Sequence, residues 1–134
     1  MFCSIDLFPT IAALAGAELP AHEIDGKDIW DVVCGQPGSV NPHEYYGFST
    51  VGTFEGIITG DGKWRLHLPH GYRTLVTPGK DGKPGRYARK EIALSLFDME
   101  NDPYETTNVI DAYPEEAKRL EALARAHQQR FFSK

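Results

Sequence analysis

The stretch from Phe54 to Pro69 constrains the fold more than any other part of this sequence. Two runs rich in β-branched and aromatic residues flank Gly60-Asp61-Gly62, whose glycines allow the positive φ angles of a tight turn. The pattern predicts a β-hairpin. In its second arm apolar and cationic side chains alternate, Trp64, Leu66 and Leu68 with Lys63, Arg65 and His67. We therefore expect one face to pack against other elements, because an isolated hairpin is only marginally stable, and the other to look outward.

Composition narrows the class of protein. A chain of 134 residues with 41% hydrophobic and 25% charged residues is typical of one globular domain. Its net charge of -5 argues against general nucleic-acid binding, which needs a surplus of Lys and Arg. No apolar run reaches the roughly 20 residues that span a bilayer, so we expect no membrane partner. Cys3 and Cys34 are too few for a disulfide framework and show no metal-ligand spacing.

The first 40 residues predict helix. Ser4 or Asp6 is placed to cap a helix that Gly16 ends, and a shorter helical segment is expected over 29–33 after the potential cap Asp28. The apolar residues of the first helix form one stripe, Leu7, Ile11, Leu14 and Ala15. This helix begins almost at the first residue, so the sequence reads as the continuation of a longer protein.

The remaining pattern predicts an α+β fold. Strands are expected over 44–48 and 94–99, beside the two arms of the hairpin, which gives a small antiparallel sheet of about four strands. Pro114, followed by two glutamates, opens a last helix. Its apolar stripe is the natural cover for the sheet and consists of Leu120, Leu123, Ala124, His127 and Phe131.

Residues 70–90 form the least regular stretch, and they are basic in an acidic protein. Glycine and proline are frequent there, and the stretch contains six Lys and Arg residues but a single acidic residue, Asp81. Two interpretations remain open. The segment is either a solvated, flexible loop or a loop that attracts an anionic group.

Two candidate motifs do not meet the requirements of a catalytic or a metal-binding site. Cys34 follows a short helical segment and has no base beside it to activate the thiol. The acidic turn at 98–105 lacks the alternating carboxylates, central glycine and late glutamate of an EF-hand. We predict no catalytic nucleophile and no metal ligands here.

His67 and His70 form the most informative polar pair. As metal ligands they are disfavoured, because Pro69 interrupts the strand and no carboxylate lies at helical spacing. Beside Arg65 and Arg73 they are better suited as donors to a negatively charged or hydroxyl-rich ligand. Ordinary surface residues remain the alternative interpretation.

Four segments, in order along the chain, resemble the C-terminal portion of the sulfatase family, the arylsulfatase-like enzymes of the alkaline-phosphatase-like group. They are Ser4 to Gly16, Ile24 to Asp28, Gly62 to His67, and Leu96 to Glu105 with Asn108. Each is a weak signal alone, and the four together are specific. The resemblance implies a sulfuric ester hydrolase as the parent enzyme.

The resemblance also implies what this chain lacks. Family members use a formylglycine made from a Cys/Ser-x-Pro-x-Arg motif and a divalent cation, usually calcium. Neither Cys3 nor Cys34 fits that motif, so the nucleophile and the metal ligands are expected upstream of Met1. We therefore expect a fragment that is inactive alone and carries no cofactor of its own.

The resemblance further implies a division of the chain. Residues 1–40 would be a helical segment from the edge of the missing α/β domain, and residues 41–134 the C-terminal subdomain, which leans over the active site. Substrate-binding candidates on the pocket rim are His67, His70, Tyr72 and Arg73. The sulfate-ester substrate would bind only in the full-length enzyme.

Two alternatives come from other functional classes. The chain could be a self-standing binding or assembly module that captures an anionic ligand through its basic 70–90 loop. Exposed apolar surface could also drive self-association. The sequence does not predict which sulfate ester is involved or where the protein is located.

Overall fold

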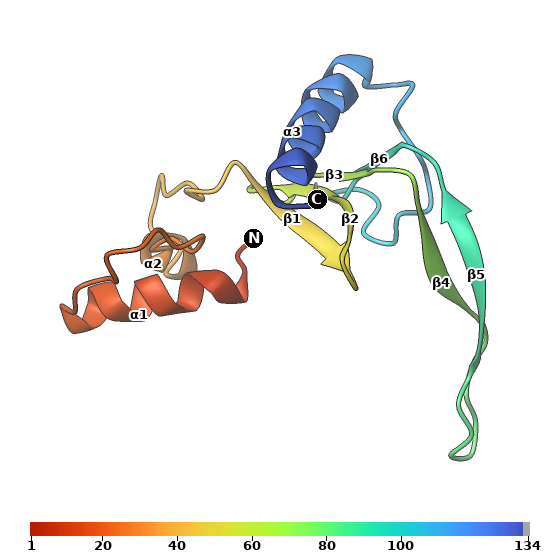
Figure 1. Ribbon diagram of the computed structural model, residues 1–134, viewed down its shortest axis with the longest axis horizontal. Coiled ribbons are helices and arrows are strands. Elements are labelled where there is room, and N and C mark those ends of the chain that lie inside the picture. The colour runs from red at the N-terminus through yellow and green to blue at the C-terminus, as the bar shows by residue number, and fades with distance from the viewer. Residues whose placement is uncertain (133–134) are drawn as a thin grey trace.

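The computed structural model describes residues 1–132 and has a mixed α and β architecture (Figure 1). The last two residues of the predicted 41–134 segment lie outside the described residues. In chain order the elements are a 3₁₀ turn at Ser4–Asp6, α1 Leu7–Ala15, α2 Trp30–Val33, β1 Tyr45–Thr50, β2 Thr53–Thr59, β3 Trp64–His67, β4 His70–Thr77, β5 Arg86–Ile92, β6 Ser95–Asp98 and α3 Pro114–Phe132. None of the described helices combines the length and apolarity needed to cross a membrane.

The predicted hairpin is β2 and β3, and it forms the centre of a four-stranded antiparallel sheet. The strand order is β1-β2-β3-β6, so the four predicted strands are the four that make up this sheet. Gly62 takes a φ of 82° in the turn, as the sequence predicted. Leu66 lies opposite Ile57 on one side and Leu96 on the other, which lines up one apolar row across three strands.

Helix α3 covers one face of this sheet (Figure 1). Ile57 and Leu66 from the sheet pack with Leu120 and Ala124 from the helix, and all four are fully buried. Burying a leucine side chain contributes about 2 kcal/mol. The prediction of an antiparallel sheet backed by a C-terminal helix is thus confirmed.

The C-terminal end of α3 packs through aromatic rings. His127 stacks on Phe54 with 4.8 Å between ring centroids, and Phe132 lies 5.2 Å from the same ring. Phe131, which the stripe predicted to be covered, is 50% exposed. Burial lowers the pKa of His127, so it is predominantly neutral near pH 7.

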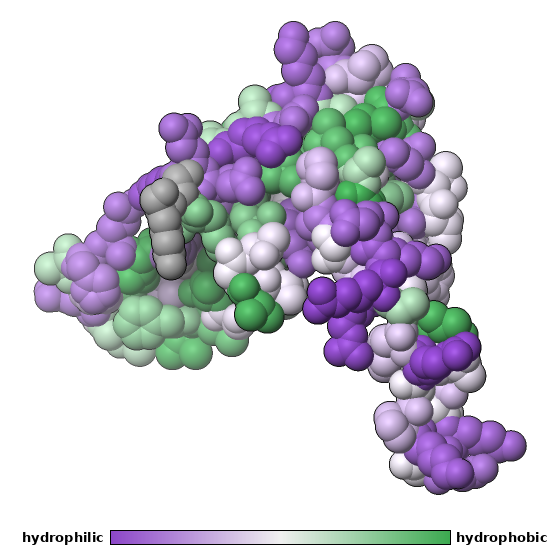
Figure 2. Space-filling view, turned by 45° about the vertical axis from the view of Figure 1, so that its right-hand side comes forward, coloured by the Kyte–Doolittle hydropathy of each residue, from purple (hydrophilic) through white to green (hydrophobic). Residues whose placement is uncertain are grey.

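Residues 70–90 are a second hairpin, which corrects the prediction of an irregular loop. Strands β4 and β5 pair with each other in a two-stranded sheet and extend away from the rest of the molecule (Figure 1). The turn signals Pro78 to Gly85 occupy only the connection, where Asp81 and Gly82 take positive φ angles. The flanking residues are β-branched or aromatic often enough to form strands. Figure 2 shows a hydrophilic tip at the end of this hairpin.

Helix α1 ends at Gly16, with a φ of 65°, as predicted, but its packing differs from the expectation. The apolar stripe is exposed, with Leu7 at 51%, Ile11 at 62% and Leu14 at 55%. Thr10 lies on the buried side and its hydroxyl accepts a hydrogen bond from the backbone N–H of Ile29 at 3.1 Å. Figure 2 shows hydrophobic surface on the side of the molecule away from the hairpin tip.

Asp6 fixes the start of α1 to the sheet region. This fully buried carboxylate accepts hydrogen bonds from the hydroxyl of Tyr46 at 2.8 Å, from His43 Nε2 at 2.6 Å and from the backbone N–H groups of Cys3 and Lys27 at 3.1 Å. Burial raises the pKa of Asp6, but the four donors outweigh it and the pKa lies below its ordinary value. Burial, together with this carboxylate, raises the pKa of Tyr46 to about 12.

Candidate functional site

The second face of the sheet carries Arg65 and His67, which alternate with the core residues of β3. Both were expected to look outward, but His67 is only 7% exposed. The ring of Phe48 covers them, with its centroid 5.2 Å from that of His67 and 4.4 Å from Arg65 Cζ. Gly56 lies between Phe48 and His67 in the register, and a Cβ at this position would come within 2.8 Å of the Phe48 ring. The glycine therefore lets the aromatic ring reach across the sheet.

Glu105 joins the two cationic side chains. One carboxylate oxygen accepts from Arg65 Nη1 at 2.7 Å, and the other lies 2.8 Å from His67 Nε2. Glu105 has a φ of 55° and belongs to the acidic turn between β6 and α3. Asp102 holds that turn by accepting from the backbone N–H groups of Thr106 and Thr107. Sequence reasoning noticed the acidic turn but assigned it no role.

The two predicted histidines lie together. The rings of His67 and His70 are stacked, with centroids 5.3 Å apart. His70 Nδ1 donates to the carbonyl of Leu68 at 2.7 Å, and its Nε2 lies 3.8 Å from a carboxylate oxygen of Glu55. Within residues 1–132, two buried polar atoms of this cluster have no hydrogen-bond partner, Arg65 Nε and His67 Nδ1.

The charge state of His67 follows from its surroundings. Burial lowers its pKa, Glu105 raises it, and the nearby Arg65 and His70 lower it further. The net effect is a pKa below the ordinary value, so His67 is predominantly neutral near pH 7. The arrangement can bind polar groups through the neutral imidazole of His67 and the paired guanidinium of Arg65.

The other two predicted residues follow His70 on the same strand, β4. Tyr72 and Arg73 are exposed on β4 and face the second strand of their own hairpin. Arg73 stacks over the ring of Tyr87, with Cζ 4.7 Å from its centroid. In the part of the chain that the structure describes, no hydrogen bond joins either residue to His67 or His70.

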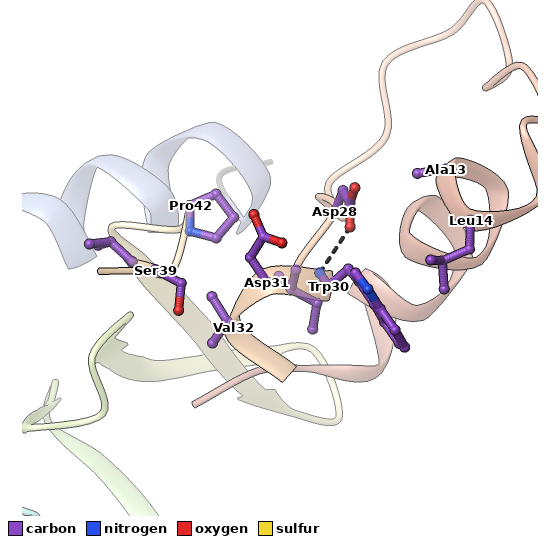
Figure 3. Close-up of a pocket in the computed structure, with 10 residues that line it drawn as sticks. Ala13, Leu14, Asp28, Trp30, Asp31, Val32, Ser39 and Pro42 are labelled. Atoms are coloured by element: carbon purple, nitrogen blue, oxygen red, sulfur yellow. Dashed lines mark hydrogen bonds between the residues drawn. The ribbon is translucent and has the colours of Figure 1, made fainter. Parts of the chain in front are cut away.

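A pocket of about 300 Å³ lies between α1 and α2, and none of the predicted site residues lines it (Figure 3). Two carboxylates, Asp28 and Asp31, are among its lining residues. Asp28 accepts a hydrogen bond from the backbone N–H of Trp30 at 2.9 Å, the dashed line in Figure 3. Ile29, and not the predicted Asp28, is the N-cap residue of α2, and Asp28 instead accepts from the backbone N–H two residues on. Its carboxylate is thus already engaged in local structure.

The residues of this chain do not fit the cofactors that the resemblance implies. Cys34 is exposed at the C-terminal end of α2, and Cys3 contacts the Asp6 carboxylate through its backbone. Among residues 1–132, no group of three or more His, Cys, Asp and Glu residues is placed to hold a metal ion. No reaction step is therefore assigned to a formylglycine or a metal in this chain.

Comparisons with known sequences give a consistent result. A comparison with protein-family models finds no match. The chain is 30% identical to arylsulfatase A of Bos taurus, over 90% of this chain and 26% of that protein. It is 29% identical to human arylsulfatase A and 29% identical to steryl-sulfatase of Rattus norvegicus, covering 25% and 24% of those proteins. The chain thus spans about a quarter of the length of the curated relatives it matches.

A solved structure shows the same fold. The structure of BT4656 in complex with its substrate D-glucosamine-2-N,6-O-disulfate matches 92% of this chain and 23% of its own, with a TM-score of 0.53 and 21% identity. The structural match and the curated relatives agree: this is a sulfatase-like sequence that corresponds to the C-terminal portion of these enzymes.

Proposed function

We propose that residues 41–134 are the C-terminal subdomain of a sulfatase and that residues 1–40 are a helical segment from the edge of its main domain. We further propose that the histidine pair, His67 and His70, forms part of the substrate-pocket rim. The observation that carries the rim proposal is the stacked pair of His67 and His70, with an unpartnered imidazole nitrogen on His67. A buried polar atom without a partner costs roughly 1–3 kcal/mol. A polar group supplied by substrate or by an adjoining domain would remove that cost.

The local electrostatics suit recognition of a polar substrate. Glu105 compensates the charge of Arg65, and His67 is predominantly neutral, so these three side chains together carry little net charge near pH 7. A neutral imidazole such as His67 forms hydrogen bonds with hydroxyl groups. This balance supports a binding role.

Tyr72 and Arg73 would extend the rim along β4. Their exposure leaves both side chains free to reach a ligand that the histidine pair has oriented. Arg73 offers a guanidinium, which matches the geometry of a sulfate group, and its stacking on Tyr87 holds it in place.

Hydrolysis itself would depend on the rest of the parent enzyme. We propose that the nucleophile and the divalent cation lie in that part, and that a sulfate ester is held in position for hydrolysis only when both parts are present, while the isolated chain makes the weaker rim contacts alone. Purified chain incubated with an aryl sulfate should release no sulfate above the blank. Turnover that disappears on mutating one of the chain's own residues would overturn this proposal.

The rim proposal is tested by titrating the chain with glucosamine 6-sulfate and following the histidine ring signals by NMR. We expect the signals of His67 and His70 to shift, and the shift to be lost in His70→Ala. The matched control is His22→Ala, because His22 is exposed in the segment before α2. Equal shifts in the control and in His70→Ala, or none at either ring, would contradict the rim assignment.

A second candidate function has one specific observation in its favour. In the β4–β5 hairpin Arg73 lies directly opposite Arg89, an arrangement that is unfavourable without an anion nearby. From residue 70 to residue 92 there are six Lys and Arg against two Asp and Glu. A module that captures an anionic ligand would use this surface.

A sulfated oligosaccharide should then bind the chain, and its affinity should fall steeply with added salt. Arg89→Ala should weaken binding several-fold, whereas Arg125→Ala, on the exposed surface of α3, should not. A flat titration at low salt would count against this candidate and would leave the rim proposal untouched.

A further inference from the structure

The geometry around His67 restricts where its proton can be. His67 Nε2 lies 2.8 Å from a carboxylate oxygen of Glu105, whose other oxygen accepts from Arg65 at 2.7 Å. A carboxylate that already pairs with a guanidinium is ionised and can only accept hydrogen bonds. Nε2 must therefore carry a proton, since an unprotonated nitrogen at that distance would place two lone pairs against each other.

The second ring nitrogen is settled by a similar argument. His67 Nδ1 is buried and has no partner in the described chain. A proton there would leave an orphaned N–H donor, and buried orphaned donors are rarer in proteins than under-used acceptors. The charges that face His67 agree with this: Arg65 and His70 disfavour a positive ring, while Glu105 favours it and Glu55 lies beyond His70.

From this geometry we infer that Glu105 is a positioning residue, which fixes His67 as the Nε2–H tautomer and leaves Nδ1 as a hydrogen-bond acceptor. The consequence for recognition rests on the rim function proposed above. Because Nδ1 is buried in the chain alone, a ligand reaches it only after a neighbouring side chain moves, and the group that then pairs with it must be a donor, such as a sugar hydroxyl. A sulfate oxygen has no proton to donate and cannot pair with Nδ1.

The turn that carries Glu105 is built to hold this carboxylate. Glu105 has a φ of 55°, a left-handed conformation that is unfavourable for a non-glycine residue. Its backbone N–H donates to the carbonyl of Asp102 at 3.1 Å, and the Asp102 side chain binds the next two backbone N–H groups. Asn108 anchors the end of the turn by accepting from the backbone N–H of Leu96 at 3.0 Å. The carboxylate therefore reaches β3 from a fixed support.

The test is the tautomer itself, measured on the intact chain by long-range ¹H–¹⁵N NMR of the histidine rings at pH 7.5. We expect His67 to show a protonated Nε2 and an unprotonated Nδ1. The opposite tautomer, or a doubly protonated ring, would overturn the inference.

Variants separate positioning from a merely structural role. Glu105→Gln leaves one accepting oxygen for two donors, and Arg65 cannot accept, so the oxygen should stay on Arg65 and the amide NH2 should face His67 Nε2. This variant should therefore shift His67 toward the Nδ1–H tautomer, while the lost charge lowers its pKa further. Glu105→Ala should lower this pKa as well and should also give a mixture of tautomers. Both variants keep the side-chain Cβ and the same backbone demand, so their difference reports on the hydrogen bond.

Glu100→Gln is the matched control, because Glu100 is an exposed acid of the same turn whose only ion pair within residues 1–132 is with Lys63 at 3.7 Å. It should leave the His67 signals unchanged. An unchanged tautomer in Glu105→Ala, with a folded amide spectrum, would show that the ring is held by its packing and would refute the role of Glu105. The tautomer measurement needs no ligand, so it can refute the role of Glu105 without refuting the rim proposal. The rim proposal is refuted by the glucosamine 6-sulfate titration instead.

Discussion

Helices α1 and α3 carry similar apolar stripes, but they use them in opposite ways. In α3 the stripe is buried against the sheet, and Leu120 and Ala124 have no exposed surface. In α1 the stripe faces out: Ile11 is 62% exposed, whereas its neighbour Ala12, on the opposite side of the helix, is 6% exposed. Periodicity thus predicts a helix, but it does not tell whether the surface that covers the helix lies within the same chain.

The two helices are also attached by different forces. Helix α3 is held by apolar burial over several turns. Helix α1 is held mainly at its beginning by polar groups, where the buried Asp6 carboxylate binds Tyr46 and His43. We propose that the surface covering the α1 stripe belongs to the remaining part of a parent sulfatase.

The largest expected effect is loss of core packing under α3. Leu120→Ala should lower the free energy of unfolding by about 3 kcal/mol, within the usual range for a fully buried leucine. Leu14→Ala, on the exposed stripe of α1, should change it by less than about 0.5 kcal/mol. Urea denaturation of both variants measures the difference. Similar losses would mean that the α1 stripe is covered in solution.

A smaller effect is expected from the polar attachment of α1. Asp6→Asn should cost roughly 2 kcal/mol, because the amide cannot accept all the hydrogen bonds that the carboxylate accepts, and buried donors are left unpaired. Asp28→Asn is the control, since Asp28 is exposed and accepts one hydrogen bond from the backbone N–H of Trp30, which the asparagine oxygen can also accept. Equal stability of Asp6→Asn and wild type would remove Asp6 as the anchor.

The pH dependence of stability should come partly from α3. His127 has a pKa lowered by burial, so below its ordinary value of 6.5 the unfolded chain binds the proton more readily than the folded chain. This contribution is complete above about pH 6.5 and is lost as the pH falls through the lowered pKa. Denaturation at pH 7 and pH 5 should show a smaller decrease for His127→Gln than for wild type. The reverse order would contradict the assigned cause.

The smallest effect on folding concerns the α1 stripe, where we propose that the exposed side chains drive self-association of the isolated chain. Replacing Phe8 and Ile11 with serine should leave the unfolding free energy nearly unchanged, because both are more than half exposed. Light scattering should show association of the wild type at high concentration and much less for the double variant. A wild type that stays a monodisperse monomer would exclude this proposal.

Much of the fold could be predicted because it depends on local patterns. The glycine-rich turn at 60–62, the alternation in β3 and the proline that opens α3 each specify an element without reference to distant residues. The hairpin at 70–92 was missed because glycine and proline at its turn dominated the interpretation. Its flanking strands carry charged residues, so no apolar face indicated a sheet.

The candidate site was only partly predictable. His67 and His70 are three residues apart, so the sequence could bring them together. Glu105 is 38 residues from His67, and only the pairing of β3 with β6 places its turn beside the histidine. The signal that could have found it was Asp102 and Asn108 on either side, two residues that fix the shape of a turn.

By itself the sequence determined the sheet's four strands, the C-terminal helix and the relation to sulfatases, since turn chemistry, periodicity and short motifs are encoded in neighbouring residues. Only the tertiary structure decided which faces are covered and which side chains meet. Asp6, Tyr46, Arg65 and Glu105 acquire their partners from segments far away in the chain. Burial and charge pairing depend on those distant partners, and no local pattern specifies them.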